Sequence, residues 1–222
     1  MQINLLEYLQ CPLCHGQLSL KINKKIKKEI ITGKFSCNKC KEIFPVKKGI
    51  PRFVKDKEKN FVKTEDSFSA KWKKHHVNHQ AKDWIDFQQK WFFDRFGWKT
   101  IKQFKEFMLT KKFVLEAGTG IGNTANLLSI NPSSTIFAID ASESIDFAFK
   151  KYGKKSNLHF LQADLRKLPI KKNFFESKGK ITRSNIHKYI SHRLPAIEIV
   201  GYRQRKRGLK YLGDLSSDFG GN

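Results

Sequence analysis

The chain has 222 residues, of which 39% are hydrophobic and 13% aromatic, so it is long enough for one ordinary domain and a small one. No segment approaches the roughly eighteen consecutive apolar residues of a membrane span, and the first ten residues lack the basic and apolar blocks of a signal peptide, so we expect a cytoplasmic protein without a membrane span. The formal charge of +24 would suit a polyanion such as RNA, but lysine is spread through nearly every segment, so the charge alone defines no site.

The first forty residues hold all four cysteines, as Cys11-Pro-Leu-Cys14 and Cys37-Asn-Lys-Cys40, with 22 residues between the two pairs. Two C-x-x-C turns at this spacing are typical of a tetrahedral structural zinc site. Two disulfides or a redox motif are the alternatives, and both are disfavoured because nothing marks the chain as secreted and no strand and helix frame either pair. With four protein ligands the zinc has no open position, so we expect it to stabilise folding and to take no part in chemistry.

Between the two cysteine pairs, residues 18–20, 30–31 and 34–36 predict the short strands of a hairpin. Such a unit is too small to be stable without its metal. Replacement of Cys37 by Ser is therefore expected to unfold this ribbon and to leave the downstream segment comparatively intact.

The segment from Phe44 to Phe53 reads Phe-Pro-Val-Lys-Lys-Gly-Ile-Pro-Arg-Phe. Together with Cys-Pro-Leu-Cys it resembles the Trm112-like zinc ribbon, which is fused to methyltransferases or is their partner. The resemblance covers roughly residues 5–55. It implies a structural or docking module, in which Phe44, Ile50 and Phe53 pack and do not bind a ligand.

Residues 56–110 are rich in aromatic side chains and predict a helical linker or lid. Trp84, Phe87 and Trp91 recur at helical spacing, and a second stripe of residues 101, 104 and 108 follows a break at Gly97. Aromatic rings among lysines can also stack nucleic-acid bases. The helical period favours packing in a core.

Two further features lie in this stretch. Residues 67–72 read Ser-Phe-Ser-Ala-Lys-Trp and are similar to a Ser-Phe-x-x-x-Trp element in proteins with the same ribbon, where it implies part of a lid. His75, His76 and His79 could be read as metal ligands, but no acidic or cysteine partner accompanies them, and we interpret them as exposed histidines.

An apolar strand beginning at Phe113 leads into a glycine-rich loop and a helix through Leu128. Such a loop lets the backbone approach a cofactor, and the following helix offers free N–H groups. A dinucleotide fingerprint would require glycine at position 123, where the chain has Asn123. The pattern Glu116-x-Gly-x-Gly-x-Gly122 instead resembles motif I of class I S-adenosylmethionine-dependent methyltransferases.

Two later strands end in carboxylates. Residues 135–140 end in Asp140, which is placed to accept hydrogen bonds from both hydroxyls of a ribose. Residues 158–162 lead to Ala-Asp164-Leu-Arg-Lys-Leu-Pro, similar to an acidic element of the same methyltransferases. The resemblance implies that Asp164 binds the adenine amino group and that Glu116 holds the ammonium group of the methionine moiety. The alternative is a generic α/β unit with acidic strand ends, which three motifs in order disfavour.

After Phe175 a class I methyltransferase would continue with a strand of the type Phe-Asp-x-Val and an acceptor loop, and neither is found in residues 176–222. One plausible strand occurs at residues 195–202, followed by the basic run 203–207. The sheet therefore looks incomplete. A truncated or frame-shifted product is favoured over a minimal domain, and a poor or inactive enzyme is expected.

The sequence thus predicts an α/β fold in which a small β zinc ribbon and a helical linker precede a partial Rossmann-like S-adenosylmethionine-binding sheet. Its expected parts are a ribbon at 1–55, a linker at 56–110, the first half of a type 11/25-like methyltransferase domain at 111–175 and a basic tail at 176–222. The expected function is methyl transfer from S-adenosylmethionine to a small molecule or biosynthetic intermediate. The alternatives are an RNA-binding or rRNA methyltransferase-related module and a non-catalytic S-adenosylmethionine-binding remnant.

No catalytic base can be named. The expected cofactor-binding residues are Glu116, Gly118, Gly120, Gly122, Asp140 and Asp164, and the expected zinc ligands are Cys11, Cys14, Cys37 and Cys40.

Overall fold

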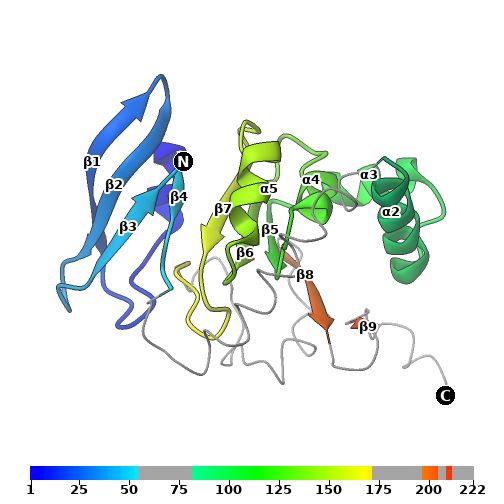
Figure 1. Cartoon of the computed structure of the whole chain (residues 1–222). Helices are drawn as coiled ribbons and strands as arrows, with labels where there is room; N and C mark the ends of the chain where they lie inside the picture. Colours follow the sequence, from blue (N-terminus) through cyan, green and yellow to red (C-terminus); the bar gives the residue numbers. More distant parts are fainter. Residues whose placement is uncertain (55–81, 172–196, 205–208, 212–222) are drawn as a thin grey trace, which may run out of the picture.

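The computed structural model describes residues 1–54, 82–171, 197–204 and 209–211, and it contains two sheets (Figure 1). The Ser-Phe-x-x-x-Trp element at 67–72 and the three histidines at 75, 76 and 79 lie outside the described residues. Within the described part, no helix has both the length and the apolar character needed to cross a membrane.

The first sheet is the predicted ribbon. A 3-10 helix, η1 (Ile3–Tyr8), precedes four antiparallel strands in the order β1-β2-β3-β4: β1 (Leu18–Ile26), β2 (Glu29–Cys37), β3 (Ile43–Lys47) and β4 (Ile50–Pro51). The hairpin predicted between the cysteine pairs is confirmed, with longer strands than expected. Phe44, Ile50 and Phe53 are all buried, as predicted.

Two helices follow, α2 (Lys82–Phe96) and α3 (Ile101–Leu109). The predicted break is confirmed, because α2 ends directly before Gly97, whose φ of +72° is in the left-handed region that favours glycine. The Thr100 side chain caps α3 by accepting a hydrogen bond from the Gln103 N–H.

The predicted apolar stripe of α2 is partly wrong. Phe87 is 58% exposed, whereas Phe92 is only 3% exposed and meets Phe104 edge-to-face at 5.8 Å between ring centroids. In α3, Phe104 and Met108 are buried as predicted, but the stripe's first residue, Ile101, is 40% exposed. Helical spacing gave the period of the stripe, but the contact between α2 and α3 selected the face that is buried.

The second sheet contains the three strands predicted around the glycine-rich loop, β5 (Phe113–Ala117), β6 (Thr135–Asp140) and β7 (Leu158–Gln162), all parallel. Between them lie α4 (Asn123–Leu128) and α5 (Ser144–Tyr152). The sheet order is β7-β6-β5-β8-β9, so the chain reverses direction across the sheet beside β5. Ligands of open α/β sheets bind at such a reversal, outside the carboxyl ends of the strands.

The remaining strands are β8 (Ile197–Gln204) and β9 (Leu209–Tyr211). They confirm the single strand expected at residues 195–202. What the sequence did not predict is the partner of this strand: β8 pairs in parallel with β5 along the whole length of β5. The pairing could not be read from sequence order, since this strand does not follow Phe175 directly and is far from β7 along the chain. With β9 added antiparallel, the described part of the sheet has five strands.

Both faces of the parallel sheet are covered, and the two covers differ. Val114, Ile136 and Phe160 belong to the core cluster that contains α3, α4 and α5. Alternate residues such as Phe137 and Leu161 belong to a second cluster together with the ribbon's apolar side chains. Because successive side chains of a strand point to opposite faces, the helices cover one face of the sheet and the ribbon covers the other (Figure 1).

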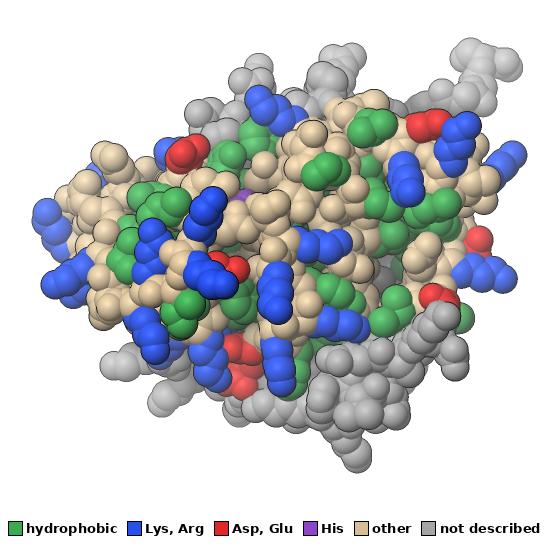
Figure 2. Space-filling model, turned by 90° about the horizontal axis from the view of Figure 1, so that it is seen from above, with side chains coloured by type: hydrophobic (Ala, Val, Ile, Leu, Met, Phe, Trp, Pro, Cys, Tyr) green, Lys and Arg blue, Asp and Glu red, His purple; other side chains and the backbone are tan. Residues whose placement is uncertain are grey.

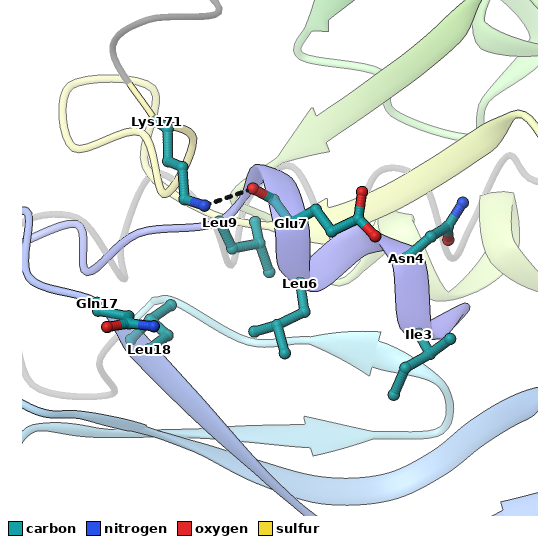
Figure 3. A pocket seen from close by; sticks show the side chains of 8 residues that line it. All are labelled: Ile3, Asn4, Leu6, Glu7, Leu9, Gln17, Leu18 and Lys171. Carbon is teal, nitrogen blue, oxygen red and sulfur yellow. Dashed lines mark hydrogen bonds between the residues drawn. The ribbon is translucent and has the colours of Figure 1, made fainter.

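Hydrogen bonds to backbone carbonyls join the ribbon to the strand β7 and to the loop after it. The Phe53 N–H donates to the Gln162 carbonyl at 2.7 Å, directly after β4. On the other side, the Gln10 N–H donates to the Pro169 carbonyl at 2.9 Å, and Lys171 Nζ donates to the Glu7 carbonyl at 2.6 Å. Figure 3 shows this last bond at the rim of a hollow of about 370 Å³ between η1 and β1.

The ribbon therefore packs as a layer against the parallel sheet and is not an independent domain. The expectation that its loss would leave the downstream segment intact conflicts with this architecture, because the sheet face under Phe137 and Leu161 would be exposed to water. Exposure of a fully buried aromatic or leucine side chain costs about 1.5–3 kcal/mol each. Several such side chains together approach the whole stability of a small domain.

We therefore predict that Cys37→Ser destabilises the parallel sheet together with the ribbon. Hydrogen exchange of amides in β2 and in β6 should accelerate to the same extent, and thermal unfolding should remain a single transition at a lower temperature. Lys24→Ser, on the exposed part of β1, serves as the control and should change neither. Unchanged protection of β6 in a protein whose β2 amides exchange freely would contradict the prediction.

Candidate functional site

The four cysteine sulfurs converge on one point. All four lie within 4.8 Å of one another, with 3.6 Å between Cys11 Sγ and Cys40 Sγ and 3.4 Å between Cys14 Sγ and Cys37 Sγ. Zinc at about 2.3 Å from each sulfur of a tetrahedron requires sulfur separations of about 3.8 Å. The donor set and its spacing therefore fit one tetrahedral zinc ion.

The two cysteine turns have the same local construction. His15 donates its backbone N–H to the Cys11 carbonyl at 2.9 Å, and Lys41 donates to the Cys37 carbonyl at 3.1 Å. His15 and Lys41 follow the second cysteine of each pair and have φ values of +58° and +61°. This left-handed residue closes each turn so that both of its thiols face the same side.

Gly16 is a residue of this site that the sequence patterns missed. A Cβ atom at this position would lie 2.8 Å from Lys39 Cβ, 3.0 Å from Cys37 Sγ and 3.3 Å from Cys14 Sγ. The backbone just after the first turn thus passes directly against one sulfur of each cysteine pair, and only glycine leaves room for it. The sequence signal was the glycine two residues after Cys14.

The second candidate site lies at the carboxyl ends of β5 and β6. The loop after β5 has three glycines in the left-handed region, Gly118, Gly120 and Gly122, with φ of +84°, +54° and +81°. Gly122 also serves packing, because a Cβ there would lie 2.8 Å from the Ala148 Cβ of α5. The sequence needs glycine at this position both for the turn and for the close approach of two helices.

Glu116 is the most unusual side chain of this site. It is fully buried at the end of β5, and its Oε2 accepts a hydrogen bond from the Thr119 hydroxyl. Its Oε1 is buried without a partner among the described residues. Burial raises the pKa of Glu116 to about 8, and the nearby Asp140 adds to this rise, while the bond from Thr119 opposes it.

Asp140 lies directly across the loop. Its Oδ2 accepts a hydrogen bond from the Gly120 N–H at 2.7 Å, and its Oδ1 accepts from the Ser142 N–H at 2.8 Å and the Ser142 hydroxyl at 2.7 Å. The structure therefore brings Glu116, the glycine loop and Asp140 together at the carboxyl ends of β5 and β6. Each oxygen of a carboxylate has two lone pairs, so Oδ2 retains capacity for a further donor.

Asp164 lies in the loop after β7 and is engaged differently. Both of its oxygens accept hydrogen bonds from Arg166, through the backbone N–H, Nε and Nη2. Burial alone would raise the pKa of Asp164, but these bonds and the Arg166 charge hold it below its usual range. Arg166, which the sequence patterns did not single out, is thus the present partner of this carboxylate.

Comparison with known proteins finds two families along the chain. Residues 115–177 match the family described as methyltransferase domain, which covers the glycine loop, Asp140 and Asp164. Residues 3–49 match the family described as Trm112p-like protein, which covers the four cysteines. The chain therefore has an N-terminal Trm112-like domain and a methyltransferase domain.

Individual relatives extend this result. A UPF0434 protein of Blochmanniella pennsylvanica is 39% identical over 62 residues, which are 28% of this chain and 98% of the relative. The chain belongs to that family through this matched part. A solved structure of an S-adenosylmethionine-dependent methyltransferase from Aquifex aeolicus is 23% identical; the match covers 52% of this chain and 70% of that chain, with a TM-score of 0.32.

The cysteine geometry leads to a prediction on metal binding. The purified protein should contain one zinc ion per chain by elemental analysis, and Gly16→Ala should weaken zinc binding by about tenfold or more, because the added methyl group displaces the ligand sulfurs. Competition with a chromophoric chelator measures the affinity.

Gly97→Ala is the matched control, because Gly97 also has a positive φ but a Cβ there would meet no atom within 4 Å. It should lower stability and leave zinc affinity unchanged. Cysteines recovered as disulfides, or equal zinc affinity of Gly16→Ala and the unmodified protein, would contradict the assignment.

Proposed function

We propose that the chain binds S-adenosylmethionine at the carboxyl ends of β5 and β6 and transfers its methyl group to a small-molecule acceptor. The observation that carries the proposal is the unpaired, fully buried Oε1 of Glu116. Burying a carboxyl oxygen without a hydrogen bond is costly. Such an atom near the carboxyl end of a strand suits a ligand that supplies the missing donor.

The cofactor-binding residues proposed are those named from the sequence. The ammonium group of the methionine moiety would satisfy Glu116, and the ribose hydroxyls would donate to Asp140, whose Oδ2 keeps a free lone pair beside Gly120. Gly118 and Gly120 let the backbone pass close to the ligand. Asp164 would accept the adenine amino group, in which case the ligand shares this carboxylate with Arg166.

When bound, the cofactor supplies an activated methyl group on its sulfonium. The protein's own residues bind and orient it, and Glu116 holds the end of the molecule opposite the adenine. Orientation of two reactants and exclusion of water account for much of the catalysis in such a group transfer. The four-cysteine site would hold zinc as a structural ion, since all four positions are filled by the protein.

We also propose the division of the chain stated from the sequence, with a ribbon at 1–55, a helical segment at 56–110, the cofactor half at 111–175 and a tail at 176–222. Support comes from the family matches, which end at residues 49 and 177. The small-molecule acceptor rests on the resemblance of residues 113–169 to class I methyltransferases.

An RNA acceptor is the second candidate, and one observation favours it. Phe35 and Val46 face the core, so the alternate residues Lys34 and Lys47 lie on the outer face of the ribbon. Lys21 lies directly opposite Lys34 in the antiparallel register, an arrangement of like charges that a bound polyanion would relieve.

Basic side chains far outnumber acidic ones on the face drawn in Figure 2. RNA binding that prefers one sequence and is lost on changing Lys21 and Lys34 to Ser would favour this candidate, whereas salt-sensitive binding without preference would reflect charge alone.

The cofactor proposal predicts that S-adenosylhomocysteine, the demethylated product, binds and that NAD does not. Gly120→Val should abolish binding, since a β-branched residue is strained at φ of +54° and fills the loop. Asp140→Ala should weaken binding by about 1–3 kcal/mol through lost hydrogen bonds. Calorimetry measures both. Glu106→Ala removes an exposed carboxylate on α3 and should have no effect. Equal or tighter binding of NAD would refute the assignment.

Glu116 predicts a pH dependence of cofactor binding. Its pKa of about 8 means that the carboxyl group is mostly protonated at pH 7 in the free protein, whereas an ammonium ligand favours the ionised form. Affinity for S-adenosylhomocysteine should therefore rise by about tenfold between pH 6 and 7 and level off near pH 8. Binding at pH 7 should release close to one proton, measured by calorimetry in buffers of different ionisation enthalpy. Glu116→Gln should abolish the proton release, and an unmodified protein that releases none would contradict this role.

A further inference from the structure

A chain of hydrogen bonds leads from the ribbon to the cofactor side of the sheet. It begins at Arg52, next to β4, which is 8% exposed and forms a two-pronged ion pair with Asp146 in the first turn of α5. Arg52 Nη1 also donates to Gln162 Oε1 at 3.0 Å. Gln162 Nε2 in turn donates to the Ala141 carbonyl at 2.9 Å.

The last link passes through one peptide group. The carbonyl of Ala141 and the N–H of Ser142 belong to the same planar peptide, and that N–H donates to Asp140 Oδ1 at 2.8 Å. When Gln162 fixes the carbonyl, it therefore also fixes the direction of the N–H that holds Asp140. The orientation of the Asp140 carboxylate depends on the orientation of the Gln162 amide.

Arg52 decides how that amide is turned. A glutamine amide has an acceptor oxygen and a donor nitrogen at nearly equal positions, and only one of its two orientations places Nε2 against the Ala141 carbonyl. The guanidinium has hydrogen-bond donors and no acceptor. It therefore favours the amide orientation in which Oε1 of Gln162 faces it. The ion pair with Asp146 holds the guanidinium in place for this contact.

We propose that Arg52 is a positioning residue for the cofactor site, which acts through Gln162 and the Ala141 peptide on Asp140. This inference rests on the proposed function insofar as Asp140 binds the ribose of S-adenosylmethionine. It gives the ribbon a role in the methyltransferase domain beyond covering a sheet face: a ribbon residue sets the geometry of a cofactor carboxylate that it does not touch.

The test compares three variants of the full chain with the unmodified protein. Arg52→Met removes the guanidinium. Gln162→Met breaks the same chain one step later and leaves the ion pair between Arg52 and Asp146 in place, so it serves also if the first variant folds poorly. Arg52→Lys keeps the positive charge and one donor nitrogen but lacks the planar guanidinium that pairs with Asp146 through two nitrogens.

The first readout needs no ligand. Amide exchange of Ser142 and Gly120, whose N–H groups donate to the Asp140 carboxylate, should accelerate by about tenfold in Arg52→Met and in Gln162→Met. The double variant should show no further change, because both substitutions break one chain, and Arg52→Lys should restore part of the protection. The Arg166 amide, bonded to Asp164, should keep its rate in every variant.

The second readout is calorimetry with S-adenosylhomocysteine, whose affinity should fall by about tenfold in both methionine variants, the size usual for loss of a residue that orients a ligand-binding group. Phe53→Leu is the control for general loosening, since it weakens the packing next to Arg52 and leaves the Gln162 side chain untouched. It should change neither the amide exchange of Ser142 nor the affinity for S-adenosylhomocysteine.

The outcomes are distinct. Unchanged Ser142 and Gly120 exchange in Arg52→Met and Gln162→Met, or the same acceleration in Phe53→Leu, would overturn the positioning role. If the unmodified protein binds no S-adenosylhomocysteine, the proposed function fails, and the exchange measurement still decides whether Arg52 orders the Asp140 loop.

Discussion

The stability of this fold depends on the burial of both apolar faces of the parallel sheet. Helices α3, α4 and α5 cover one face, and the other carries Phe137 and Leu161, which would be exposed without a second cover. The ribbon supplies that cover. A small zinc ribbon has little core of its own, so the ribbon and the sheet share one. The four-cysteine site therefore bears on the stability of a domain that lies entirely outside the cysteine motif.

The same contact reaches the cofactor side of the molecule. β4 lies beside β7, and Arg52 extends from there to Asp146 and Gln162. The Glu116 carboxyl group in β5 is costly in the free protein, because its buried Oε1 has no partner among the described residues. A site of this kind requires rigid support from its neighbours, because a loosely held carboxylate would turn toward the nearest donor. The ribbon gives part of that support at Asp140.

Much of this protein could be predicted from its sequence because the decisive signals are local. Strand β5 and helix α4 follow from an apolar run that enters glycines, and the turns need those glycines for positive φ. The cysteine pairs predict their own cluster because a C-x-x-C turn fixes two thiols within four residues. Gly16 escaped notice, since its reason is the sulfur of a cysteine from the other pair, 21 residues away in sequence. Phe87 was misplaced for a similar reason, because a partner helix selects the buried face.

The sequence by itself determined the cysteine cluster, the glycine loop and the strands β5, β6 and β7, since each rests on residues that are neighbours along the chain. Only the tertiary structure decided that β8 lies beside β5, that the ribbon covers the sheet and that Arg52 faces Gln162. These contacts join residues about 80 to 110 positions apart. No periodicity or spacing along the chain encodes such pairs, because they arise from the burial of apolar faces and the pairing of polar groups once the layers have come together.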